Sequence, residues 1–157
     1  MKYKTMFQSL YLVFLVGCSS NPLINHFDLP EGAGARLDCS WNGRLNDGQV
    51  NLFEGYNGTE LNHGPNVAGK AAKYRVPSGP AIINVKINWM VTIFGPIRQA
   101  HAEFSLNLKE DASYEIDAVR NGTEVVIKIR DGEGSVVTQP VMASFGDSIP
   151  IPIVAPI

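Results

Sequence analysis

The chain has 157 residues, of which 45% are hydrophobic and 18% are charged, with 13 basic and 15 acidic side chains. This length fits one domain of ordinary size, and the composition is that of a globular rather than a disordered chain. The charges are interspersed, without a basic patch or an acidic run. The composition therefore argues against a nucleic-acid partner, because phosphate binding requires clustered lysine and arginine.

Residues 1–17 have the organisation of a secretory signal peptide. Lys2 and Lys4 precede an apolar run, residues 6–16, which only Gln8 and Ser9 interrupt. That run is too short to cross the ~30 Å hydrocarbon core of a bilayer as a permanent helix. A positive start followed by a short apolar segment is typical of a cleaved export signal.

A cysteine motif ends this segment. Leu15, Val16, Gly17 and Cys18 follow one another, and this Leu-Val-Gly-Cys sequence resembles the lipobox of bacterial lipoproteins. A thiolate is a nucleophile that can accept diacylglycerol as a thioether, and the small residue before it lets a peptidase reach the peptide bond. The resemblance implies cleavage between Gly17 and Cys18 and acylation of the new amino terminus. The alternative is an ordinary signal peptide with an incidental cysteine.

Acylation of Cys18 would anchor the protein to a membrane, because two or three acyl chains bind stably where one is marginal. The only expected cofactor is this covalent diacylglycerol and N-acyl lipid. Ser19 stands where enterobacterial sorting reads an inner-membrane aspartate, so it implies the outer membrane, with the domain facing the periplasm; the inner membrane and the cell surface remain alternatives. Processing removes Lys2 and Lys4 and leaves 11 basic and 15 acidic residues, a net charge of −4.

Residues 18–35 are predicted to be a lipidated flexible tether. They are rich in proline, glycine and asparagine and show no periodicity. Phe27 and Leu29 are the candidates for packing onto the domain. Cys39 is the only cysteine besides Cys18, so the processed chain cannot form an internal disulfide.

Residues 36–147 are predicted to form the folded domain. Alternation over residues 36–41 predicts a strand with Leu37, Cys39 and Trp41 on one face, and residues 50–53 predict a second strand after the turn at residues 46–48. Residues 55–72 are rich in glycine and asparagine and predict a long loop, with a turn of helix at 66–72 as an alternative. Residues 73–76 predict a short strand.

The clearest strand is predicted at residues 82–94, where alternate positions are apolar without a gap: Ile83, Val85, Ile87, Trp89, Val91 and Ile93. The same pattern recurs at residues 100–108 and 114–118. The Asn121-Gly122 dipeptide predicts a hairpin turn into residues 125–129. Residues 131–134 lead to Val136 and Val137, the last strand predicted. Seven or eight strands without an amphipathic helix predict an all-β fold, an antiparallel β-sandwich.

The second half of the chain also resembles a known kind of domain. The segments VPSGPAIINVKINW, AEFSLNLKEDASYEIDAV and EVVIKIRDGEGSVV resemble the PEGA-like and transthyretin-like small domains of bacterial envelope lipoproteins. The resemblance covers residues 76–137 and consists of strands and turns. It implies a β-sandwich with a binding or scaffolding role, and it transfers no functional residue.

The sequence contains only weak indications of a catalytic or metal-binding site. Residues 64–71 approach a phosphate-binding loop, but Ala71 lacks the hydroxyl that would bind Mg²⁺. His26, His63 and His101 do not have the paired spacing of zinc ligands. Cys39 falls among apolar neighbours, where a thiol acts as a small hydrophobe. Three carboxylate pairs could suggest glycosidase chemistry or Ca²⁺ binding, yet all lie at turns or on a solvent face: Glu110–Asp111, Glu115–Asp117 and Asp131–Glu133.

Residues 148–157 form an isoleucine-rich tail. Prolines at 150, 152 and 156 exclude a central strand. The tail either covers an edge of its own sandwich or is an exposed arm that inserts into a partner or the membrane surface, with Ile151, Ile153 and Ile157 as the candidate partner contacts. We therefore expect a non-catalytic lipoprotein that binds another envelope protein or a surface polymer. The alternative is an envelope hydrolase or metal-dependent enzyme that uses loop residues near His63.

Overall fold

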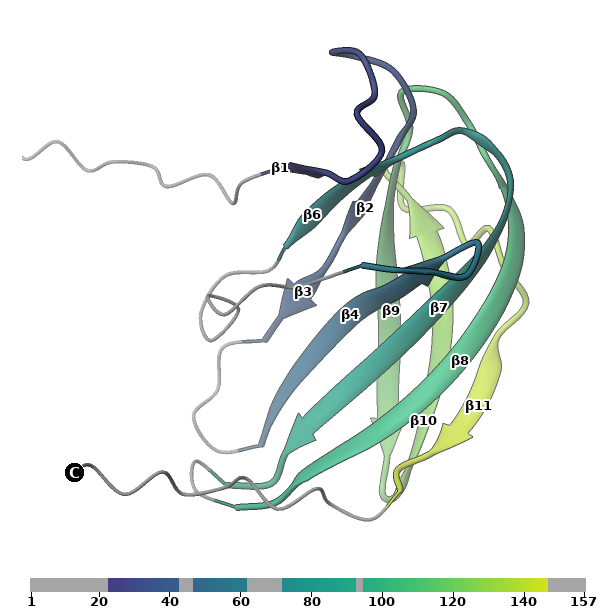
Figure 1. The fold of residues 1–157 in the computed structure, drawn as a ribbon. Helices are drawn as coiled ribbons and strands as arrows, with labels where there is room; N and C mark the ends of the chain where they lie inside the picture. Colours follow the sequence, from purple (N-terminus) through teal and green to yellow (C-terminus); the bar gives the residue numbers. More distant parts are fainter. Residues whose placement is uncertain (1–22, 43–46, 62–71, 93–94, 147–157) are drawn as a thin grey trace, which may run out of the picture.

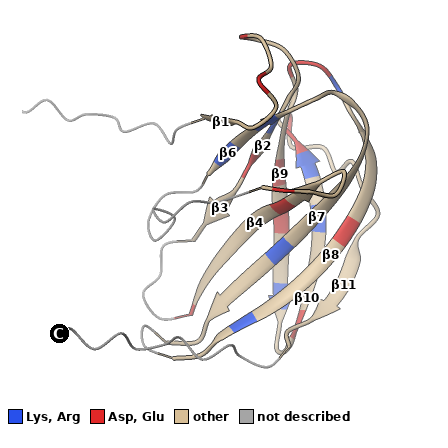
Figure 2. Cartoon of the chain, in the orientation of Figure 1, with Lys and Arg blue, Asp and Glu red and all other residues tan. Residues whose placement is uncertain are grey.

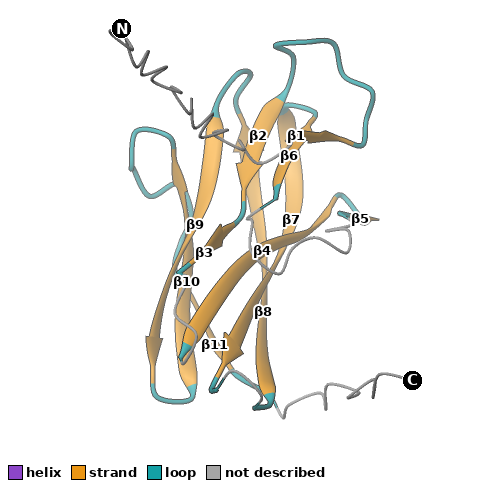
Figure 3. Ribbon diagram, turned by 90° about the vertical axis from the view of Figure 1, so that its left-hand side faces the viewer, coloured by secondary structure: helices purple, strands orange, loops and turns teal. Residues whose placement is uncertain are grey.

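The computed structural model describes residues 23–42, 47–61, 72–92 and 95–146. These residues form two sheets that pack face to face as a β-sandwich, and they contain no helix (Figures 1 and 3). Consequently, the described part of the chain contains no helix that could span a membrane. The predicted all-β sandwich is confirmed.

The described residues form eleven strands, some of only two or three residues, where the sequence predicted seven or eight. The first sheet contains, in spatial order, β1 (Leu23–Asn25), β6 (Lys73–Val76), β2 (Ala35–Asp38), β9 (Ser113–Asn121), β10 (Glu124–Asp131) and β11 (Val141–Ser144). The second contains β3 (Ser40–Trp41), β4 (Gly48–Tyr56), β7 (Gly79–Met90) and β8 (Ile97–Leu108), with β5 (Thr59–Glu60) paired to β4. Most pairs are antiparallel; β1 with β6 and β2 with β9 are parallel.

The long strands β7 and β8 confirm the alternation expected from the sequence. Ile83, Val85 and Ile87 of β7 are completely buried between the sheets. They face apolar side chains of the opposite sheet that are equally buried, among them Val125, Ile127 and Ile129 of β10. β7 begins at residue 79 and ends at residue 90, so it lies further toward the amino terminus than the predicted 82–94.

The chain changes sheets at Cys39. β2 ends at Asp38 in the first sheet and β3 begins at Ser40 in the second, so Cys39 lies between the layers and is 5% exposed. Leu37 is buried as predicted, but the prediction that Trp41 shares its buried face is wrong, since Trp41 is 37% exposed. Alternation fails here because the two halves of the segment belong to different sheets.

β9 pairs with β10 along one side, but this crossover leaves part of its other side without a strand neighbour. β2 pairs with β9 only as far as Glu115. Beyond that point, the Gln49 side-chain amide donates to the Ala118 carbonyl (3.1 Å) and the Asn51 amide donates to the Ile116 carbonyl (3.4 Å). Side chains of β4 thus satisfy strand-edge acceptors that would otherwise be buried without a partner.

The predicted tether is too long. From Leu23 the chain belongs to the domain, because β1 pairs in parallel with β6 over three residue pairs. The Phe27 ring packs edge-on against the Tyr56 ring, with 5.2 Å between the ring centroids, and Leu29 is half-buried. The expected packing of Phe27 onto the core is confirmed.

Two hairpin turns lie at Asn-Gly dipeptides. The predicted hairpin between β9 and β10 is confirmed, but its two turn residues are Gly122 and Thr123, because Asn121 ends β9 and pairs with Glu124. Asn57 and Gly58 join β4 to β5 and both have positive φ, 47° and 79°, as this kind of tight turn requires. The loop predicted from residue 55 is therefore wrong in its first part. Residues 62–71 lie outside the described residues.

The last strand differs from the prediction. Val136 makes only an isolated bridge to Arg130, and Val136 and Val137 are 45% and 39% exposed. The Ile129 N–H of β10 donates to the Thr138 hydroxyl, so it is paired with a side chain and not with the backbone of a neighbouring strand. Pro140 has no N–H to donate, and the strand that pairs with β10 is β11, directly after it.

Candidate functional site

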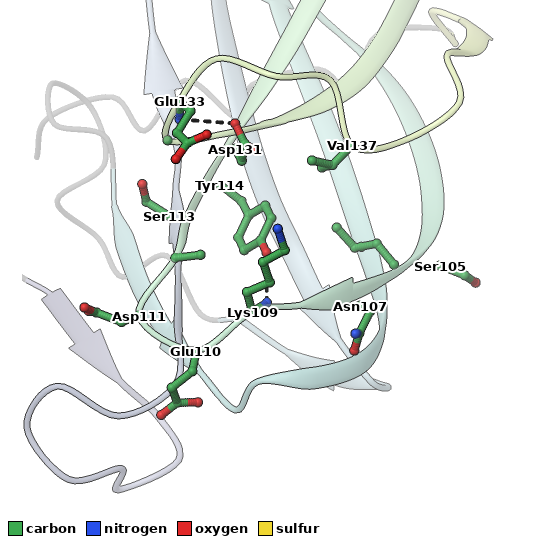
Figure 4. A pocket seen from close by; sticks show the side chains of 13 residues that line it. Ser105, Asn107, Lys109, Glu110, Asp111, Ser113, Tyr114, Asp131, Glu133 and Val137 are labelled. Atoms are coloured by element: carbon green, nitrogen blue, oxygen red, sulfur yellow. Dashed lines mark hydrogen bonds between the residues drawn. The ribbon is translucent and has the colours of Figure 1, made fainter.

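An open cleft of about 830 Å³ lies between the carboxyl end of β8 and the connection from β10 to β11. Tyr114 lies in its middle, with Asp131 and Glu133 on one side and Glu110 and Asp111 on the other (Figure 4). The Tyr114 hydroxyl accepts the Lys109 backbone N–H at 2.9 Å, and Tyr114 is 3% exposed. It therefore holds the turn between β8 and β9 in place.

Glu110 uses its carboxylate to connect three segments of the chain. It accepts hydrogen bonds from the Ser78 hydroxyl and from the Gly34 backbone N–H, the latter at 2.7 Å. These donors, Ser78 first, hold the pKa of Glu110 below its ordinary value although the group is fully exposed. The carboxylate is therefore ionised and acts as a structural acceptor at the rim of the cleft.

Asp131 also serves its own turn. One carboxylate oxygen accepts the backbone N–H groups of Glu133 (3.1 Å) and Ser135 (2.9 Å). Its backbone N–H donates to the Ser135 carbonyl at 2.9 Å. This is the arrangement by which aspartate stabilises a tight turn. With Glu110, two carboxylates of the cleft are hydrogen-bonded to loop backbone.

The structure brings together two carboxylate pairs that are distant in the sequence, Glu110–Asp111 and Asp131–Glu133. In the sequence they look like separate turns. The predicted hairpin could have shown that they are close. Pairing of β9 with β10 sets Asp131 opposite Tyr114, so the turn before β9 and the turn after β10 must lie at the same end of the sandwich. Of the third pair, Glu115 lines a small neighbouring cavity with Asp131, whereas Asp117 lies apart, since its carboxylate binds Arg130 at 2.7 Å and Lys128 at 3.3 Å.

A second polar cluster lies on the outer face of the second sheet. The register of β4 shifts between Phe53 and Gly55, and the bulged residue between them, Glu54, forms an ion pair with Lys86 and a 3.1 Å contact with His101 Nδ1. Burial raises the pKa of Glu54, but the hydrogen bonds and charges of Lys86 and His101 outweigh it, so the pKa is lowered.

We expect Glu54→Gln to destabilise the protein at pH 7 by about 1 kcal/mol or less, since the pair is only partly buried. Because the folded-state pKa of Glu54 lies below its ordinary 4.5, the stabilisation is complete above pH 4.5 and is lost as the pH falls through the lowered value. Urea denaturation of both proteins between pH 7 and pH 3 measures the difference.

The matched control is Glu115→Gln, an exposed carboxylate on β9 without an ion pair among the described residues. It should leave stability unchanged across the same pH range. A difference between wild type and Glu54→Gln that persists at low pH, or one shared by Glu115→Gln, would contradict the assignment.

Cys39 is an inert thiol in the folded domain. Burial raises its pKa to about 12, which outweighs the hydrogen bond from the Phe53 backbone N–H to Sγ at 3.3 Å. The thiolate, the reactive form, is therefore absent near neutral pH. This agrees with the interpretation of Cys39 as a small core residue.

The remaining histidine that the structure describes, His26, stacks on the Tyr74 ring with 5.9 Å between ring centroids. Within the described ranges, no three His, Cys, Asp or Glu side chains are grouped so as to hold a metal ion. Several predicted site residues lie outside those ranges: Gly17, Cys18, Ser19, His63, the 64–71 loop, Ile151, Ile153 and Ile157.

Comparison of the chain with models of known families, with curated proteins and with solved structures found no match in any of the three. The resemblances to bacterial lipoproteins and to PEGA-like or transthyretin-like domains therefore stay predictions.

Proposed function

We propose that this protein is a bacterial envelope lipoprotein, acylated on Cys18, whose β-sandwich binds another protein or a surface polymer without catalysing a reaction. The observation that carries the anchor is the Leu-Val-Gly-Cys motif directly after a short apolar run with two lysines before it. Ser19 supports an outer-membrane location facing the periplasm.

The geometry of the cleft supports a binding role. Its carboxylates at Glu110 and Asp131 bond to backbone groups that shape the loops. A nucleophile activated by a neighbouring base would require a different arrangement, in which the base faces the nucleophile. The cleft is open along one side of the sandwich, which suits an extended ligand better than a small enclosed one.

Replacing Cys18 with serine tests the anchor. The wild-type protein should incorporate labelled palmitate and partition into the detergent phase, because its acyl chains bind membranes. Cys18→Ser should lose both properties and keep the mass of the uncleaved precursor. Labelling and the mass of the membrane form are read by gel and mass spectrometry.

Cys39→Ala is the matched control, since Cys39 is buried between the sheets and is not the acylated thiol. It should keep full labelling. Palmitate incorporation into Cys18→Ser, or its absence from the wild type, would show that the anchor is assigned wrongly.

A further inference from the structure

β8 has an edge that the described residues leave partly free. It is the last strand of its sheet and pairs with β7 from Ile97 to Leu108. Near its beginning, the Gly146 backbone N–H donates to the Gln99 carbonyl at 2.9 Å. This hydrogen bond joins β8 to the residues that follow β11 of the other sheet. Beyond Gln99, no residue in the described ranges bonds to the backbone of this edge.

The Gln99 contact shows which groups face outward. In an antiparallel strand the N–H and C=O of one residue point to the same side, and the side alternates from residue to residue. Since the Gln99 carbonyl points away from β7, the backbone groups of His101, Glu103, Ser105 and Asn107 also point away. This edge thus presents alternate donors and acceptors in the spacing that an added strand requires.

A groove runs along the free edge. The cleft of about 830 Å³ and a neighbouring cavity of about 490 Å³ share Ser105 and Val137. Across from β8, the groove is lined by the connection to β11, where Val136 and Val137 are exposed. An added strand would lie ~4.8 Å from β8, and every second side chain would point toward these valines.

The groove is acidic. Its two cavities are lined by Glu103, Glu110, Asp111, Asp131 and Glu133, and by one cation, Lys109. Five carboxylates and one ammonium group give a net charge of −4, and Figure 2 shows an acidic position on the upper part of β8. Two copies joined through this edge would bring two such grooves together, so like charges disfavour self-association.

We propose that the free edge of β8 binds an extended, basic segment of a partner protein, which adds a strand through main-chain hydrogen bonds and places lysine or arginine against the acidic groove. The inference rests on the proposed binding function and names its ligand class. It is independent of the anchor, because it involves residues 101–139 alone.

The test uses the full chain in detergent and the peptide acetyl-Lys-Val-Lys-Val-Lys-Val-Lys-amide, with its Glu-for-Lys counterpart as the control. We expect calorimetry to detect binding of the basic peptide only. Methylating the backbone nitrogens of either the lysines or the valines should abolish binding for one set and spare the other, since an added strand bonds through alternate residues. This readout leaves the protein unaltered.

Variants of the protein give a second readout. Ser105→Pro removes an outward N–H without touching the β7 ladder and should weaken binding about tenfold or more. Glu103→Lys should also weaken binding, whereas Glu124→Lys, an exposed carboxylate at the end of β10 opposite to Asp131, should not. Far-ultraviolet circular dichroism confirms that each variant is folded.

Three results would overturn the proposal. The first is equal binding of basic and acidic peptides, or of both methylated sets. The second is peptide binding that occurs only after the residues beyond Gly146 are removed, which would make the chain's own tail the occupant. The third is a dimer that Ser105→Pro dissociates, which would make a second copy the occupant. None of these results would affect palmitate labelling at Cys18, so failure of the edge proposal and failure of the anchor are distinguishable.

Discussion

Replacing Gly34 with alanine is expected to destabilise the domain by about 3 kcal/mol or more. Gly34 has φ of +81°, a left-handed conformation that side chains disfavour. An alanine Cβ would lie 2.3 Å from the Val76 carbonyl oxygen and 2.7 Å from Leu29 Cδ1. The backbone oxygen belongs to β6 inside the sheet and cannot move aside without breaking strand pairs.

The effect should extend to the cleft, because Gly34 is hydrogen-bonded to its rim. Its N–H donates to the Glu110 carboxylate at 2.7 Å, and its carbonyl accepts the Asp111 N–H at 2.8 Å. A shift of Gly34 away from Val76 would therefore strain the turn between β8 and β9.

Gly32→Ala separates the two causes. Gly32 has nearly the same φ, +82°, but an alanine Cβ at this position would have no other atom within 4 Å. Gly32→Ala should lower the free energy of unfolding only by the cost of holding an alanine in the left-handed conformation, about 1 kcal/mol. Urea denaturation of both variants measures the difference, and equal losses would show that the close approach to Val76 is unimportant.

Ile87→Ala should destabilise the protein by about 3–4 kcal/mol. Ile87 is completely buried and lies in register between Asn51 on β4 and Ala100 on β8. Truncation leaves a cavity between two sheets that other strands hold apart, so collapse cannot fill it. A loss of this size is a large fraction of the ~5–15 kcal/mol stability of a typical domain.

The control is Ile82→Ala on the same strand. Ile82 points to the outer face and is 45% exposed, so its truncation should cost about 1 kcal/mol or less. Thermal and urea unfolding, followed through tryptophan fluorescence, give both values. Similar losses at residues 82 and 87 would mean that the inner and outer faces of β7 are assigned wrongly.

Local signals in the sequence predicted much of the fold. A period of two identified the buried faces of β7 and β8, because successive side chains of a strand point to opposite sides. Asn-Gly dipeptides identified two hairpins, because Asn57, Gly58 and Gly122 adopt positive φ at low cost. The motif at Leu15–Cys18 likewise needs only adjacent residues, and it predicts the anchor whatever the domain looks like.

What the sequence left open depends on which strands become neighbours. Alternation tells which side chains share a face but not which sheet they enter, so it could not place the crossover at Cys39 or the exposure of Trp41. The amide contacts of Gln49 and Asn51 with β9, and the Glu54 bulge, likewise follow from pairings between distant segments.

The position of the acidic groove also depends on which distant segments become neighbours. Besides Glu103 on β8, its carboxylates belong to two turns, Glu110–Asp111 and Asp131–Glu133, and each turn by itself looks like an ordinary solvated loop. Only the packing of two sheets sets these turns at one end of the sandwich, next to the part of the β8 edge whose backbone has no hydrogen-bond partner among the described residues. Adjacent residues thus determined most strands, their turns and the predicted anchor, whereas non-local strand pairing placed the β8 edge and the acidic groove to which we propose that a partner binds.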